Sequence, residues 1–292
     1  MPRSGFAAGL AAYLLWGVFP LYWPLLEPAG ALEILAHRIL WSIAIVAVLL
    51  AATQGFRWVR DLGGRRALLL GLAAALITVN WGLYIYGVNS GHVVETSLGY
   101  FINPLVTVAL AVLVLGERLR PAQWSAVAVG LLAVVVLTVA YGRPPWIALT
   151  LACSFGFYGL IKKQAGVGGT QSLAVETAFL ATPALVFVLW LSASGQGTFA
   201  SEGAGHALLM IGGGLATAVP LMLFGAAAVR IPLSTIGLLQ YIAPILQFAI
   251  GVAVRHEDMP ASRWAGFTLV WIAVSIFTWD SLRARRAVTV RA

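Results

Sequence analysis

The stretch LEILAHRILWSIAIVAVLLAA, residues 32–52, indicates which kind of fold this chain adopts. It is long enough to cross a hydrocarbon core of roughly 30 Å as a helix, which takes about 20 apolar residues. The whole chain is 61% hydrophobic and only 10% charged, whereas soluble domains are about 25% charged. We therefore expect a membrane protein, and Arg38 inside this stretch needs a specific explanation.

Apolar runs of similar length recur along the rest of the chain. Each is rich in Leu, Ala, Val and Gly and lacks the strict alternation of a barrel strand, so helices are expected. The runs cover residues 5–23, 32–52, 67–88, 96–115, 122–141, 145–161, 172–191, 206–229, 235–254 and 264–281. They predict an all-α polytopic membrane protein with ten transmembrane helices. The first run has no convincing cleavage site, so we interpret it as a span and not as a signal peptide.

The net charge of +8 would suit a nucleic-acid partner, but topology explains it better. If the N-terminus is cytoplasmic, fourteen Lys and Arg residues fall in cytoplasmic loops and tails and three fall outside, which is the positive-inside pattern. The fourteen are Arg3, Arg57, Arg60, Arg65, Arg66, Arg118, Arg120, Lys162, Lys163, Arg230, Arg283, Arg285, Arg286 and Arg291, and the three are Arg143, Arg255 and Arg263. We expect both termini in the cytoplasm and no nucleic-acid partner.

The two halves of the sequence resemble each other at a shift of 140 positions. Pro104 pairs with Pro244, Glu117 with Glu257 and Trp124 with Trp264, and SLGYFINP (97–104) matches GLLQYIAP (237–244). Five helices per half is an odd number, so the second copy must enter the membrane from the opposite side. This predicts an inverted-topology repeat, residues 1–143 and 144–292. Such repeats typically build secondary transporters with a central site.

Several motifs resemble one family of transporters. They are WGVFP (16–20), AHRILWS (36–42), TSLGYFINPL (96–105), LGER (115–118), FGFYGLIKK (155–163) and LSTIGLLQYIAP (233–244). Over nearly the whole chain the sequence is similar to the RarD group of EamA-type permeases, in the drug/metabolite transporter superfamily. The resemblance implies a bacterial inner-membrane permease with a five-plus-five helix fold and a central cavity. It also implies small organic solutes, drugs or metabolites as substrates, and an association with chloramphenicol sensitivity.

Arg38 is the leading candidate for a functional residue. An unpaired arginine near the centre of a transmembrane helix costs about 2.5–3.5 kcal/mol on insertion scales, so it should face protein or water and have a partner. Three alternatives stay open: snorkelling toward the nearer surface with a structural pairing to Glu33 or a carbonyl, a contact in a gate, or recognition of an anionic or carboxylate-bearing solute. A guanidinium suits the last role because its donors form a fixed fork and it stays charged.

Other polar and aromatic side chains fall at depths where lipid would disfavour them. Together they could line an amphipathic pocket that binds a small organic solute, with interhelical hydrogen bonding as the alternative for the amides. The candidate substrate-binding residues besides Arg38 are Tyr13, Trp16, Asn80, Trp81, Tyr84, Tyr100, Asn103, Tyr158, Gln240 and Tyr241. Three aromatic residues near predicted helix ends, Tyr22, Trp23 and Trp146, are interpreted as interfacial belts.

Four further residues are candidates for gating or coupling. His37 and Glu176 are titratable groups in predicted spans, and each also has a structural alternative: a hydrogen bond for His37 and snorkelling for Glu176. Pro104 and Pro244 fall near the middles of the fourth and ninth predicted helices. There they would act as static kinks or as moving hinges.

The main alternative function is an intramembrane enzyme acting on a lipid-phase or amphipathic substrate. The sequence has no H-E-x-x-H motif, no evident metal cluster and no paired acids at a common depth, so we expect no catalytic residues, metal or cofactor. A channel is a third alternative. It is disfavoured because the sequence has no repeated charged ring and no carbonyl filter signature. The expected partners are the lipid bilayer and a small organic solute, with a homodimer as an open alternative to the monomer.

Overall fold

The computed structural model describes residues 3–53, 55–116, 119–228, 230–231 and 233–289. Within these residues the regular secondary structure is entirely helical, which confirms the all-α prediction. Glu117, which the 140-position repeat pairs with Glu257, lies outside the described residues, and so does Arg118.

The helices follow the apolar runs of the sequence. The first half forms α1 (Arg3–Gly17), α2 (Phe19–Tyr22), η1 (Trp23–Leu26), α3 (Ala31–Thr53), η2 (Arg57–Asp61), α4 (Gly64–Asn89), α5 (Val93–Leu115) and α6 (Pro121–Tyr141). The second half forms α7 (Trp146–Ala165), α8 (Gly169–Ala193), α9 (Gly203–Ala228), α10 (Leu233–Leu239), α11 (Ile242–Ala253) and α12 (Ala261–Thr289). Helices α6 and α7 stop at Gly142 and Gly166, which have φ of 67° and 61°. Glycine adopts this left-handed conformation without steric cost.

Seven helices of the described chain are long and apolar enough to cross a membrane, and the bent pair 4–17 and 19–26 would make eight. The bend of 43° comes between α1 and α2, just before Pro20. Helix α7 falls outside this group and carries Lys162 and Lys163 in its last turn. The ninth predicted span is also outside it, because it is divided into α10 and α11. The chain is therefore a multi-pass membrane protein.

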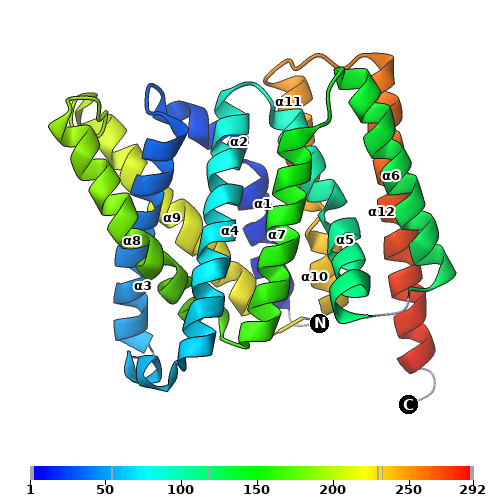
Figure 1. Cartoon of the computed structure of the whole chain (residues 1–292), viewed down its shortest axis with the longest axis horizontal. Helices are drawn as coiled ribbons and strands as arrows, with labels where there is room; N and C mark the ends of the chain where they lie inside the picture. The colour runs from blue at the N-terminus through cyan, green and yellow to red at the C-terminus, as the bar shows by residue number, and fades with distance from the viewer. Residues whose placement is uncertain (1–2, 54, 117–118, 229, 232, 290–292) are drawn as a thin grey trace.

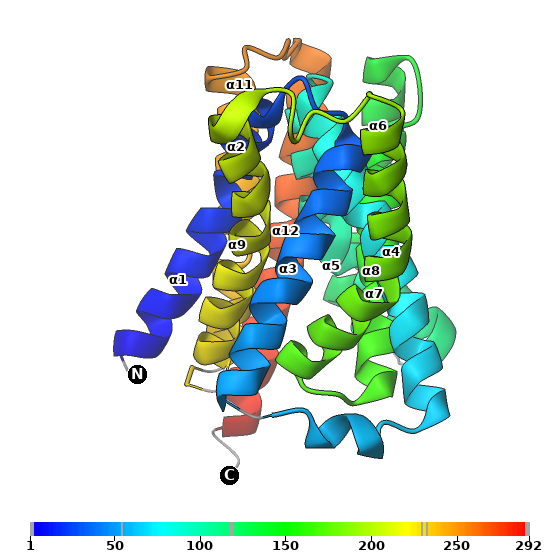
Figure 2. The ribbon, with the colours of Figure 1, turned by 90° about the vertical axis from the view of Figure 1, so that its left-hand side faces the viewer.

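The long helices run side by side in alternating directions, and α1 begins at the same end of the bundle at which α12 finishes (Figure 1). The short helix η2 lies across that end (Figure 2). Helices of the two halves interleave: α3 packs against α8 and α9, α7 against α4 and α5, and α11 against α1 and α5. The centre of the bundle is therefore built from both halves of the chain.

The two repeated prolines occupy different positions in the structure. Pro104 lies inside the continuous helix α5, as the sequence predicted. Pro244 lies in the first turn of α11, because the chain leaves the helical path at Gln240 and Tyr241. The expectation that Pro244 lies near the middle of a helix was therefore wrong. Proline has no N–H, and the first turn of a helix does not need that donor.

Glycine allows the closest contact between α3 and α9. A Cβ on Gly214 would lie 2.6 Å from the Cβ of Trp41 and 3.0 Å from the backbone nitrogen of Ser42. The neighbouring Gly213 faces Arg38, with 3.8 Å between the two Cβ positions. Lipid tails are as apolar as leucine, so helices in a membrane associate through such close packing and through polar contacts.

Candidate functional site

Arg38 lies in the interior of the bundle, and its residue is only 4% exposed. Its Nε donates a hydrogen bond to Oγ1 of Thr217 on α9 at 2.6 Å. Its guanidinium carbon lies 4.0 Å from the ring centroid of Trp81 on α4 and 5.2 Å from that of Trp23 on η1. The ring centroid of Phe19 lies 5.9 Å from the same guanidinium carbon. Arg38 is thus a buried cation enclosed by aromatic faces, an arrangement that stabilises the charge through cation–π attraction.

The guanidinium has no ion-pair partner in the described part of the chain. Glu33, which the sequence offered as one partner, accepts a hydrogen bond from the backbone nitrogen of Thr198 at 2.6 Å instead. The acceptor that the structure provides is a neutral hydroxyl. A full positive charge therefore stays uncompensated in a low-dielectric environment, which is costly unless an anion joins it.

Three predicted residues on α4 and α5 come together beside Arg38. Asn80 donates to the carbonyl of Leu151 at 2.9 Å, and its Oδ1 accepts from the hydroxyl of Tyr100 at 3.3 Å. The rings of Tyr84 and Tyr100 meet edge to face at 5.6 Å. Both tyrosines lie close enough to the guanidinium for electrostatic interaction. The hydroxyl of Tyr84 is buried and has no hydrogen-bond partner among the described residues.

A second group of predicted residues lies on the first helix. The ring centroids of Tyr13 and Trp16 lie 5.2 Å apart. Phe224 of α9 completes the cluster, with its ring centroid 5.9 Å from that of Trp16. The carbonyl of Trp16 accepts a hydrogen bond from the amide of Gln247 at 3.1 Å. Trp16 also packs against the cluster that contains Trp23, so it connects the two groups.

The remaining amides and Tyr241 are more dispersed. Gln240 and Tyr241 form the break between α10 and α11, and the hydroxyl of Tyr241 lies 3.5 Å from that of Thr278 on α12. The Oδ1 of Asn103 on α5 is buried without a hydrogen-bond partner in the described chain. These contacts do not connect the three residues to Arg38.

Glu176 and Tyr158 form a separate polar cluster between α7 and α8. Glu176 is 1% exposed and accepts hydrogen bonds from the hydroxyls of Tyr158 at 3.0 Å and Ser172 at 2.5 Å. The ammonium of Lys162 lies 3.2 Å from its Oε1 and donates to the Tyr158 hydroxyl at 2.7 Å. The carboxylate of Glu176 is therefore paired inside the protein, which differs from the snorkelling alternative.

A row of aromatic rings connects the two polar clusters. The row begins at Tyr100 beside Arg38, whose ring centroid lies 6.4 Å from that of Phe155. The centroid of Phe155 in turn lies 5.7 Å from that of Tyr158. His37, in contrast, faces the other way and stacks on Phe199 of the loop between α8 and α9, with 4.5 Å between centroids. His37 is thus part of the loop packing and does not share the Arg38 cluster.

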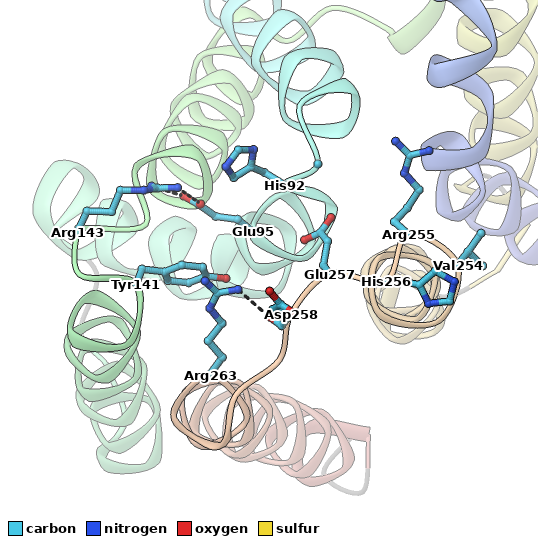
Figure 3. Close-up of a pocket in the computed structure, with 11 residues that line it drawn as sticks. His92, Glu95, Tyr141, Arg143, Val254, Arg255, His256, Glu257, Asp258 and Arg263 are labelled. Atoms are coloured by element: carbon cyan, nitrogen blue, oxygen red, sulfur yellow. Dashed lines mark hydrogen bonds and ion pairs between the residues drawn. The ribbon is translucent and has the colours of Figure 1, made fainter.

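A polar cavity of about 550 Å³ (Figure 3) opens at the end of the bundle that lies opposite the start of α1 in Figure 1. Two carboxylates at this cavity connect separate helices. Glu95 pairs with Arg143 at 2.9 Å and accepts from the backbone nitrogen of Ile147, at the start of α7, at 3.0 Å. Glu257 accepts from the backbone nitrogens of Val93 and Val94 at the start of α5. Carboxylates are stabilising at helix N-termini because free N–H groups are directed at them.

Burial raises the pKa of the Glu257 carboxyl, against the opposing effect of the two backbone hydrogen bonds and of Arg255 and Arg263. Arg263 in turn lies over the ring of Tyr141 at 4.2 Å, beside the Glu95–Arg143 pair (Figure 3). The loop that carries Glu257 is thus attached to α5 by a carboxylate that is costly to keep charged.

The sequence did not identify three residues around Arg38: Phe19, Trp23 and Thr217. Trp23 is 0% exposed, so its interpretation as part of an interfacial belt was wrong. The 43° bend after α1 turns this ring inward. Tyr22, also interpreted as a belt residue, donates to the carbonyl of Leu209 at 2.5 Å. A signal was available in the sequence, since the two prolines Pro20 and Pro24 flank this aromatic stretch.

A bundle of apolar helices with an enclosed arginine and polar clusters at its centre defines a multi-pass membrane protein of the transporter class. The EamA-like transporter family model matches residues 3–139. The chain belongs to the RarD-type EamA permeases of the drug/metabolite transporter superfamily.

Three relatives support this assignment along the full chain. The protein RarD of Streptomyces exfoliatus is 60% identical over 97% of this chain and 91% of its own length. The protein RarD of Escherichia coli is 38% identical, over 97% of each chain. The chloramphenicol-sensitive protein RarD of Pseudomonas aeruginosa is 32% identical over 97% of this chain and 96% of its own.

The fold is also found in a solved crystal structure of an 18% identical protein. The two chains superpose with a TM-score of 0.60 over 94% of this chain and 98% of that one. At this identity the likeness concerns the fold alone.

Proposed function

We propose that this protein is a secondary transporter of small organic solutes, drugs or metabolites in the bacterial inner membrane, working by alternating access. The two moving units are the five-helix repeats 1–143 and 144–292, and both termini are cytoplasmic. Arg38 lies at the solute site between them. The observation that carries the proposal is the buried guanidinium, which has no ion-pair partner in the described chain and is bonded across the two halves to Thr217.

The packing of the helices supports the inverted repeat. If α1, α3, α4 and α5 correspond to α7, α8, α9 and the α10–α11 pair, contacts should occur in matching pairs. The contact of α4 with α7 then corresponds to that of α9 with α1, and α5 with α7 to α11 with α1. Likewise α3 with α9 corresponds to α8 with α4. This is the pattern that two copies related by a pseudo-two-fold axis would produce.

The carboxylates of the outer cavity support a closed outer side. Glu95, in the first repeat, binds the start of α7 in the second, and Glu257, in the second repeat, binds the start of α5 in the first. Opening toward the outside would separate these pairs. In this proposal Glu176 and Lys162 stabilise the inner half, where they join α7 to α8.

The proposal is tested by reconstitution of the purified protein in liposomes that are incubated with a cellular metabolite extract. Mass spectrometry of the lumen should find unmodified solutes that empty liposomes exclude. Arg38→Gln should abolish their uptake, whereas the matched control Arg60→Gln, an exposed arginine in η2, should leave it unchanged. Chemically altered species in the lumen would contradict the permease and favour an intramembrane enzyme.

A further inference from the structure

Resting on the proposed function, we infer that the solute group bound at Arg38 is a single planar monoanion, a carboxylate. We further infer that Tyr84 and Trp23 are the additional donors that recognise it.

The charge balance around Arg38 favours a bound anion. The Arg38 residue is 4% exposed. Among the described residues no ion pair reaches its guanidinium, and its one hydrogen bond, from Nε to Thr217, uses a neutral acceptor. Its two terminal nitrogens have no acceptor in the described chain. One bound negative charge would neutralise the site, whereas a dianion would leave an excess charge in the same low-dielectric surroundings.

The geometry of the guanidinium favours a planar acceptor. Trp81 lies against it at 4.0 Å, and Trp23 and Phe19 approach at 5.2 and 5.9 Å. Since these rings surround the group and Thr217 takes Nε, the edge formed by the terminal nitrogens is left for the ligand. A carboxylate matches that edge with two parallel hydrogen bonds.

Two buried donors in the same cluster also lack acceptors among the described residues: the hydroxyl of Tyr84 and Nε1 of Trp23. Tyr84 is 3% exposed and Trp23 is 0% exposed, and both belong to the packed cluster against which Trp81 lies. A buried donor without an acceptor costs free energy, so unpaired donors around an unpaired cation indicate a missing acceptor. The surrounding rings favour an apolar body behind the charged group.

The test measures binding to the full-length protein in detergent, without transport. Benzoate is the probe, and benzamide, benzylamine and phenylphosphonate are its neutral, cationic and dianionic analogues. Benzoate should raise the melting temperature in a concentration-dependent way, and the three analogues should not. Equal stabilisation by benzoate and benzamide, or none by benzoate, would overturn the inference. Stronger stabilisation by phenylphosphonate would replace the carboxylate with a phosphate-like ligand and would also overturn it.

Variants then test Tyr84 and Arg38 one at a time. Tyr84→Phe keeps the ring and removes the donor, so benzoate affinity should fall roughly tenfold or more. The control Tyr86→Phe, exposed on the same helix, should bind as the native protein does. Arg38→Met should abolish benzoate binding. Without ligand, the melting temperature of this variant should equal or exceed that of the native protein, because removing an uncompensated buried charge is favourable. Arg38→Met melting well below the native protein would identify a structural arginine and overturn the inference.

The two proposals can fail separately. If benzoate binds as described but no solute crosses the membrane in liposomes, the carboxylate site stands and the transport function fails. If uptake occurs only for neutral or cationic solutes and benzoate does not stabilise the protein, transport stands and the carboxylate site fails.

Discussion

The Nε of Arg38 on α3 donates a 2.6 Å hydrogen bond to the hydroxyl of Thr217 on α9, although the two residues are 179 positions apart in the chain. The hydroxyl of Thr217 in turn donates to the carbonyl of Gly213 at 3.1 Å. This pair fixes the direction of the guanidinium inside the bundle and joins the two halves of the sequence at the candidate site.

Replacing Thr217 with valine keeps the volume and removes the acceptor. Because the Nε–H of Arg38 would then be buried without a partner, the protein should lose about 1–3 kcal/mol of stability. Thermal melting in detergent measures the change. Thr268→Val on α12, where the hydroxyl is exposed and bonds its own helix, should change stability little. An unaltered melting temperature for Thr217→Val would show that the bond contributes nothing.

Gly214→Ala should separate α3 from α9. Its Cβ would lie 2.7 Å from the backbone carbonyl carbon of Trp41, and backbone cannot move away as a flexible side chain can. Overpacking of this kind costs about 1–3 kcal/mol. Gly225→Ala on the same helix meets no atom within 4 Å, and it should be neutral or slightly stabilising. The two melting temperatures should therefore differ, and equal values would contradict the close contact.

Glu257 should give the stability a dependence on pH. Burial raises the folded-state pKa of its carboxyl above the ordinary value of 4.5. The folded protein then binds more protons than the unfolded chain, and stability falls as pH rises from about 4.5 through the raised pKa. Glu257→Gln removes this term. The melting temperature of the native protein minus that of the variant should thus decrease between acidic and neutral pH.

The comparison with Glu257→Gln is needed because other groups at the same cavity also carry charge. They are His92, Glu95, Tyr141, Arg143, Arg255, His256, Asp258 and Arg263. They are present in both proteins, so their own titration largely cancels in the difference. A difference that increases toward neutral pH would mean that the hydrogen bonds from α5 outweigh burial.

The Lys162–Glu176 pair should be coupled in stability. Breaking a buried ion pair leaves one charge uncompensated, so Glu176→Gln and Lys162→Met should each cost about 3 kcal/mol. That value is at the lower end for buried pairs, since the Lys162 side chain is 24% exposed. The double variant should cost less than the sum of the single ones. Lys163→Met, at the next and exposed position, is the control, and additive effects would argue against the pair.

Labelling of introduced cysteines tests the predicted orientation. With Cys153 replaced by serine, Gln196→Cys in the α8–α9 loop should react with an impermeant maleimide in intact cells. Arg60→Cys in η2 should react only after the membrane is opened. Both positions are exposed and lie at opposite ends of the bundle. The reverse pattern would place the termini outside.

The membrane class, the all-helical character, the family and the burial of Arg38 could be predicted from the sequence alone. These follow from local sums: the run 32–52 is apolar enough to enter a bilayer whatever it packs against, because transfer free energies add residue by residue. Asn80, Trp81 and Tyr84 were also predictable as a group, because residues three and four apart share one helix face.

The partners of these residues could not be predicted, because they depend on how the helices pack. Trp23 was assigned to the membrane interface because it ends the apolar run 5–23, yet the bend before Pro20 places it against Arg38. Pro244 lost its mid-helix position because the chain breaks just before it. Glu257 binds the start of α5 from 164 positions away. Such contacts depend on which helices become neighbours, because a buried polar group bonds to the acceptor or donor that the neighbouring helix presents. Helix adjacency is not contained in any local sum over the sequence.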